Sequence, residues 1–188
     1  MSSKNVGKKL VGVWNTKTIV AVAIGAALFG VLMNYGGIPV FTNTSLTTAM
    51  IVPVVVGAMY GALPAAVAAG VGNVIADLIG GWGLWFDWSI GNFCAALFVG
   101  FGAYVLMSKF STKNVILYVV LCVLGNGLAF GVVTPILTAI FYGSELNVTF
   151  LQAIYGSLSN ILVEVVVGLP VLYLLSKRTA AHSNLEEE

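Results

Sequence analysis

The chain has 188 residues, of which 59% are hydrophobic and only 8% are charged, and its mean hydropathy is +1.01. Soluble domains carry about 25% charged residues, so this composition excludes a soluble catalytic or nucleic-acid-binding module. A membrane-spanning helix needs roughly 20 apolar residues, which leaves room for about six spans. The predicted fold class is therefore an all-α, polytopic membrane protein with six transmembrane helices in one domain.

Apolar runs divide the chain into three parts. Residues 1–17 are polar and basic, residues 18–176 hold the spans, and residues 177–188 form a polar tail. The last four residues, 185–188, are either native or an appended remnant. The predicted spans cover residues 18–34, 46–60, 64–79, 88–107, 115–142 and 150–175.

Two features of the spans predict departures from straight helices. The fifth span is long enough to need a tilt, a kink at Pro135 or a partial break. The second contains Pro53, which membrane helices tolerate when neighbouring groups satisfy the freed backbone. Between the first two spans, Gly36-Gly37-Ile-Pro39 and the polar residues after it predict an external loop.

The positions of the basic residues predict the orientation. Of the eight Lys and Arg residues, four precede the first span, two lie between the fourth and fifth, and two follow the sixth. With six spans, all eight lie on one side, and the positive-inside rule puts both termini in the cytoplasm of a cell-membrane protein. The opposite face carries Asp77, Asp87 and Glu145 and is expected to be acidic.

An aromatic cluster follows the glycine pair Gly80-Gly81. Trp82, Trp85, Phe86 and Trp88 lie within seven residues, just before a new apolar run. We interpret them as a mobile flap over a ligand pocket, with the Gly36-Gly37 loop as the opposing lip. The alternative is an anchoring belt, because tryptophan concentrates at membrane interfaces.

A buried carboxylate is predicted in the sixth span. Glu164 lies near its middle, and Asn160 lies one turn earlier on the same helix face. A carboxylate at that depth costs a few kcal/mol, so it should face the interior and have a partner or a function. The candidate substrate-binding residues are Asn34, Asp77, Trp82, Trp85, Phe86, Trp88, Asn92, Asn126, Asn160 and Glu164, and Asn73 extends the same polar lining. The alternative is a hydrogen-bonded clamp that only fixes the helices.

The first span is rich in small residues, including Ala23, Ala27 and Gly30. Small residues four apart let two helix backbones approach closely in a membrane. This face either docks another membrane subunit or packs inside the protein, and its spacing does not distinguish the two.

The sequence lacks the residues that an enzyme would need. Ser157 and Ser159 faintly resemble the site of an intramembrane serine protease. Such a serine needs a positioned base, but the only histidine, His182, lies in the tail. The sequence has no His/Cys cluster for a metal and no phosphate-binding loop of the Walker type. We therefore expect no catalytic residue, no metal and no cofactor.

The run GALPAAVAAGVGNVIADLIGGWGLWFDWSIGN, residues 61–92, suggests a family. With about six spans and a small-residue first helix, it resembles the substrate-binding (S) components of energy-coupling factor (ECF) vitamin transporters. The riboflavin-type group, to which a cobalamin-specific member is similar, is the nearest likeness. Relatives in this group often have His at Asn73 and Gly-Pro at Leu63-Pro64, and these departures leave the substrate open.

The resemblance implies a mechanism and partners. An S component binds its vitamin at the outer face, associates with a transmembrane coupling subunit and two cytoplasmic ATPase subunits, and topples in the membrane to release the vitamin inside. The face of Ala23, Ala27 and Gly30 would then dock the coupling subunit. The remaining partner would be membrane lipid, and no nucleic acid is expected.

The distribution of charge limits the kinds of vitamin that could be the substrate. The outer half has no Lys or Arg, so anionic vitamins such as folate, biotin or pantothenate would be desolvated without a counter-charge. A neutral or cationic, flat, amide-rich ligand fits better. The broad opening expected between glycine-rich lips favours cobalamin, with riboflavin as the alternative. A rival from another class is a structural or self-associating helical membrane protein without a ligand.

Overall fold

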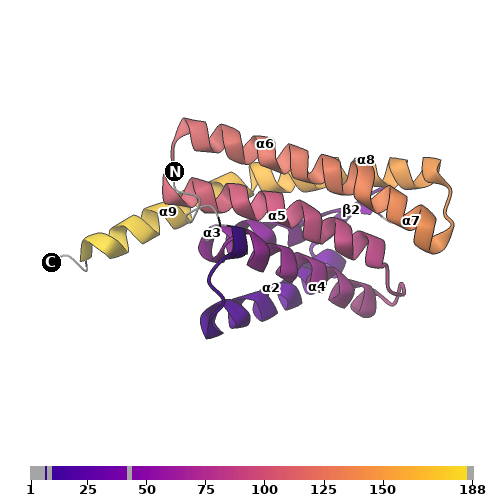
Figure 1. Ribbon diagram of the computed structural model, residues 1–188, viewed down its shortest axis with the longest axis horizontal. Coiled ribbons are helices and arrows are strands. Elements are labelled where there is room, and N and C mark those ends of the chain that lie inside the picture. Colours follow the sequence, from indigo (N-terminus) through magenta and orange to yellow (C-terminus); the bar gives the residue numbers. More distant parts are fainter. Residues whose placement is uncertain (1–6, 8–9, 42–43, 186–188) are drawn as a thin grey trace.

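The computed structural model describes Gly7, residues 10–41 and residues 44–185, and it is almost entirely helical (Figure 1). Five apolar segments are long enough to cross a membrane: Thr16–Tyr35, Ala62–Gly80, Phe86–Ser108, Thr112–Tyr142 and Leu146–Thr179. A sixth apolar segment, Thr48–Tyr60, is shorter. The predicted all-α membrane fold is confirmed, with a second span that falls short of the usual length.

The elements follow one another with short connections. In chain order they are α2 (Thr16–Tyr35), β1 (Gly37–Phe41), β2 (Thr44–Thr47), the 3-10 turn η1 (Thr48–Met50), α3 (Ile51–Tyr60), α4 (Ala62–Gly80), α5 (Phe86–Ser108), α6 (Thr112–Leu128), the π-helical turn η2 (Ala129–Val133), α7 (Thr134–Tyr142), α8 (Leu146–Val166) and α9 (Gly168–Leu185). Figure 1 shows the long helices running roughly side by side.

Small residues determine how closely the first helices pack. A Cβ on Gly57 of α3 would overlap the Cα of Gly100 on α5, so these two backbones are in direct contact. A Cβ on Gly72 of α4 would lie 2.6 Å from the Cβ of Phe29 on α2. Lipid supplies no hydrophobic drive between helices, and close backbone approach of this kind is what associates them.

The two longest segments are interrupted. In the segment Thr112–Tyr142, the π-helical turn η2 separates α6 from α7 just before Pro135, where a kink or partial break is predicted. In the segment Leu146–Thr179, α8 ends at Val166 and α9 begins at Gly168, an interruption that the sequence analysis did not predict. Pro170 explains the second interruption, because a proline inside a helix removes one backbone hydrogen bond.

A β-hairpin occupies the position of the predicted external loop. Strand β1 pairs antiparallel with β2, with Gly37 opposite Thr47 and Ile38 opposite Leu46. The hydroxyl of Thr47 donates to the carbonyl of Leu32 at 2.8 Å and ties the hairpin to the end of α2. The β-branched residues in this stretch favour extended backbone.

The described basic residues gather at one end of the bundle. Lys17 lies at the start of α2, Lys109 and Lys113 flank the α5–α6 turn, and Lys177 lies on α9; these elements meet at one end (Figure 1). The other end carries the α4–α5 turn and the α7–α8 turn. Lys4, Lys8 and Lys9 lie outside the described residues. The predicted tail from residue 177 continues α9 as helix to Leu185.

Candidate functional site

A buried polar cluster joins α4 and α5 near the turn that connects them. The amide of Asn73 donates to the Ser89 hydroxyl at 3.1 Å and to the Asp77 carboxylate at 3.4 Å. The amide of Asn92 donates to Oδ1 of Asn73 at 3.0 Å. All four side chains are buried, and a membrane interior makes such contacts valuable because water is not there to replace them.

The tryptophan-rich turn is anchored to this cluster. Helix α4 ends at Gly81, whose φ of 68° lies in the left-handed region that glycine tolerates. The backbone N–H of Trp85 then donates to the Asp77 carboxylate at 2.9 Å, and its indole N–H donates to the carbonyl of Trp82 at 3.1 Å. Trp82 and Trp85 are exposed, as predicted residues of a flap or a belt would be.

Helix α7 contacts the same turn from the other side. The hydroxyl of Tyr142 accepts a hydrogen bond from the N–H of Phe86 and donates to the carbonyl of Leu84, both at 3.1 Å. The rings of Tyr142 and Trp85 lie 4.7 Å apart. One turn back, the Thr138 hydroxyl donates to the buried carboxylate of Asp87.

These α7 residues were missed by the sequence analysis. Thr134, Thr138 and Tyr142 recur every four residues and therefore lie on one helix face. That periodicity is the signal that would have identified them. Ser89 was missed as well, and no local pattern marks it.

A second polar contact lies between α6 and α8. The amide of Asn126 donates to the Glu164 carboxylate at 2.8 Å and to the carbonyl of Cys122 at 3.0 Å. The Tyr118 hydroxyl donates to the backbone carbonyl of Glu164 at 2.8 Å. Glu164 is only 1% exposed, as expected of a carboxylate that faces the interior, and the amide of Asn126 is its partner. Asn160, one turn earlier on α8, is also buried.

Three buried polar atoms have no hydrogen-bond partner among the described residues. They are Oδ1 of Asp87, Oδ1 of Asn92 and Oδ1 of Asn126. All three are acceptors, and they lie on α5 and α6. Leaving a buried acceptor unpaired costs about 1 to 3 kcal/mol, so a donor from water or a ligand would stabilise this interior.

The remaining predicted site residues are divided between interior and surface. Asn34 donates to the carbonyls of Gly30 and Ala76, both at 3.0 Å, and thereby joins α2 to α4. Trp88 packs against Phe130 of η2, with 5.6 Å between ring centroids. Phe86 is exposed on the first turn of α5.

The small residues of α2 point in two directions. Ala23 and Ala27 are exposed, on the same face as Ile24 and Val31. Gly30 is buried, and a Cβ there would lie 2.6 Å from Ile75 of α4. The exposed alanines are thus available to another helix, whereas Gly30 packs inside the protein.

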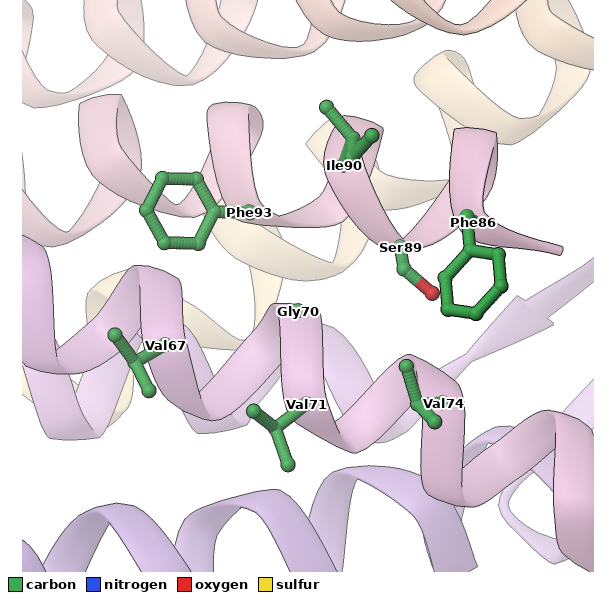
Figure 2. Close-up of a pocket in the computed structure, with 8 residues that line it drawn as sticks. All are labelled: Val67, Gly70, Val71, Val74, Phe86, Ser89, Ile90 and Phe93. Carbon is green, nitrogen blue, oxygen red and sulfur yellow. The ribbon is translucent and has the colours of Figure 1, made fainter. Parts of the chain in front are cut away.

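A cavity of about 270 Å³ lies between α4 and α5 (Figure 2). Its lining residues are Val67, Gly70, Val71, Val74, Phe86, Ser89, Ile90 and Phe93. Figure 2 shows the Ser89 hydroxyl as the only side-chain polar group among them, pointing from α5 towards α4. Phe86 is the only predicted site residue in this lining, so the cavity does not coincide with the predicted pocket. A larger groove of about 650 Å³ lies between α2 and α3, with Lys17 among its lining residues.

Comparison with known proteins identifies the family that the chain matches. Residues 13–177 match the family described as ECF-type riboflavin transporter, S component. A UPF0397 protein of Photobacterium profundum is 35% identical over 179 residues, which cover 92% of this chain and 97% of that protein. A UPF0397 protein of Vibrio vulnificus is also 35% identical, with 92% and 98% covered. One from Clostridium perfringens is 28% identical over 176 residues, with 92% and 95% covered.

Proposed function

The chain belongs to the family of ECF-type riboflavin transporter S components, and from this premise we propose that it binds cobalamin at its outer face as the vitamin-binding subunit of an ATP-driven importer. The observation that carries the proposal is the set of unpaired buried acceptors on Asp87, Asn92 and Asn126. A ligand rich in N–H groups would satisfy such acceptors.

The charges near the site support a neutral or cationic ligand. Asp77 and Asp87 lie at the ends of α4 and α5 that would face outward, and Glu164 lies near the middle of the segment Leu146–Thr179. All the described Lys and Arg residues lie on elements at the opposite end of the bundle. Cobalamin and riboflavin are both flat and rich in donors, whereas folate and biotin bring carboxylates that would meet carboxylates here.

Two observations bear on the choice between cobalamin and riboflavin. Two glycine pairs lie towards the end that would face outward, Gly36-Gly37 at the start of the hairpin and Gly80-Gly81 at the end of α4, and we infer that they let this end open widely. This favours the larger ligand, cobalamin. The description of the matching family favours riboflavin, which is the second candidate.

The proposed partners are a transmembrane coupling subunit and two cytoplasmic ATPase subunits. The coupling subunit would dock on the exposed face of α2 that contains Ala23 and Ala27. The positive-inside rule would place the basic end of the bundle, and with it both termini, in the cytoplasm of the cell membrane.

Extraction of ligand from the purified protein, followed by mass spectrometry, tests the vitamin directly. Uptake assays in a strain without its own importer then separate the candidates, with the coupling subunits supplied together with this chain. Growth rescue by cobalamin is the expected result. Rescue by riboflavin but not by cobalamin would mean that riboflavin is the substrate. If no vitamin binds saturably and no ATPase subunit copurifies, the structural or self-associating alternative holds.

A further inference from the structure

The long segment Thr112–Tyr142 contains a candidate hinge. Its π-helical turn η2, Ala129–Val133, interrupts the α-helical hydrogen-bond ladder, and such turns are frequent at functional sites. Gly127 and Gly131 lie before and within this turn, and a Cβ on either would meet no heavy atom within 4 Å. Gly125 differs, since its Cβ would lie 2.6 Å from Phe98. Close packing therefore explains glycine at 125, whereas backbone freedom explains it at 127 and 131.

Helix α7 packs against α5, α8 and η2, and side-chain contacts tie its far end to one short segment, residues 84–87. The Tyr142 hydroxyl makes two hydrogen bonds there, with the carbonyl of Leu84 and the N–H of Phe86, and the Tyr142 ring packs on Trp85. The Thr138 hydroxyl adds a bond to Asp87. Tyr142 and the turn are exposed, so water can compete for the Tyr142 bonds. We call these contacts the latch.

The closed arrangement leaves one polar atom unsatisfied at the latch. Thr138 contacts Oδ2 of Asp87, and Oδ1 of the same carboxylate has no partner among the described residues. Unpaired buried acceptors raise the free energy of the closed state relative to a state that admits water or a ligand. The cost of opening is lowered accordingly.

We propose that α7 is a hinged gate: it swings as a rigid helix about Ala129–Val133 and is held shut by the contacts of Tyr142 and Thr138 with residues 84–87. The swing itself needs no ligand, while the role of α7 as the entrance to a binding site rests on the proposed function. A helix of nine residues is about 13.5 Å long, so a tilt of about 15° would move its tip by about 3 to 4 Å. The competing explanation is a static turn that only accommodates Pro135.

Spin-label distances measured by pulsed electron paramagnetic resonance test the hinge in lipid nanodiscs. Cys94 and Cys122 are first replaced by alanine, and labels are placed at Leu78 of α4 and Ile140 of α7, which are 66% and 69% exposed. The control pair joins Leu78 to Ile116, which is 59% exposed and lies on α6, on the other side of η2. Each pair is measured with Tyr142 intact, with Tyr142→Phe, and with Tyr142→Phe combined with Gly127→Ala and Gly131→Ala.

The hinge predicts a specific combination of results. Tyr142→Phe should broaden the Leu78–Ile140 distance distribution or shift it by about 3 to 4 Å, leave the Leu78–Ile116 distribution unchanged, and lose this effect when both glycines become alanine. An unchanged Leu78–Ile140 distribution, or equal shifts in both pairs, would overturn the gate. These distances are read without vitamin, so a failure of vitamin binding alone refutes the proposed function and not the hinge.

Discussion

The side-chain amide of Asn126 on α6 lies 2.8 Å from the carboxylate of Glu164 on α8, and both residues are almost fully buried. This hydrogen bond joins two helices through residues that are 38 positions apart in the sequence. It leaves Oδ1 of Asn126 without a partner among the described residues, so the amide of Asn126 is paired only through its nitrogen. Glu164 is thus a helix clamp in this arrangement, and ligand contact would come through the free acceptor beside it.

Substitution of Glu164 separates these two roles. Glu164→Leu leaves the Asn126 amide buried without its acceptor, which should destabilise the protein by about 1 to 3 kcal/mol. Glu164→Gln keeps an acceptor oxygen and should retain most of the stability. Thermal unfolding in detergent measures the first effect, and vitamin affinity of the Glu164→Gln variant measures the second. Unchanged stability of Glu164→Leu would contradict the role of Glu164 as a helix clamp. Unchanged vitamin affinity of Glu164→Gln would mean that Glu164 clamps the helices and does not contact the vitamin.

The exposed alanines of α2 should matter for assembly and not for vitamin binding. Ala23→Leu or Ala27→Leu would hold a partner helix away, and overpacking of about 1 to 3 kcal/mol weakens assembly by about 5- to 150-fold. Copurification with the coupling subunit measures assembly, and vitamin titration of the isolated chain measures binding. Val31→Leu, on the same exposed face, is the matched control.

Gly30 provides the opposite comparison on the same helix. A Cβ at this position would lie 2.6 Å from Ile75, so Gly30→Leu should lower the stability of the isolated chain. If Ala23→Leu abolished vitamin binding while assembly survived, the exposed alanines would serve the fold and the docking interpretation would be wrong.

Trp85 should contribute to the affinity for the vitamin. Its ring lies against Tyr142 and is partly exposed, so a flat ligand can stack on it. A stacked aromatic is worth about 0.5 to 1.5 kcal/mol beyond its buried area, so Trp85→Ala should weaken binding about two- to tenfold. Quenching of tryptophan fluorescence or calorimetric titration measures this change. Trp14→Ala, distant in sequence and two residues before α2, is the control, and equal affinity in both variants would leave Trp85 as a membrane anchor.

The close contact of α3 with α5 predicts a stability effect at Gly57. A methyl group there would overlap the backbone of Gly100, and neither backbone can move without shifting a whole helix. Gly57→Ala should therefore cost about 1 to 3 kcal/mol or prevent folding. Gly127→Ala places its methyl group in open space and should leave the unfolding temperature unchanged or raised. Comparison of the two melting curves checks the prediction.

Apolar run length predicted the long helices well, because a membrane requires a continuous helix wherever the chain crosses it. The predicted spans 18–34 and 88–107 correspond to α2 and α5 within two residues at each end. The hairpin was not predicted, because strands of four and five residues next to polar residues resemble a loop in sequence.

Contacts between distant segments were harder to predict. The cost of an isolated carboxylate in a membrane predicted that Glu164 has a partner or a function, but it did not identify Asn126 as that partner. The contacts of Tyr142 join residues 56 and 58 positions apart, and no local pattern reports them. Likewise, small-residue spacing predicted close packing of α2 but did not show that Gly30 faces α4 while Ala27 is exposed.

The charge distribution makes a final prediction about anionic vitamins. Asp77 and Asp87 are buried at the end of the bundle that carries the α4–α5 turn, and the described Lys and Arg residues lie at the other end. A carboxylate-bearing ligand bound near the two aspartates would lose its hydration without gaining a counter-charge. Excess folate or biotin should therefore leave cobalamin uptake unchanged, whereas excess unlabelled cobalamin should suppress uptake of the labelled vitamin. Competition by folate at concentrations comparable with cobalamin would refute the charge argument. Asp77 is the position at which this argument is best tested. Asp77→Asn removes a negative charge but keeps an oxygen that can accept from the N–H of Trp85, so the tryptophan-rich turn should stay in place. The variant should therefore discriminate less strongly against anionic vitamins.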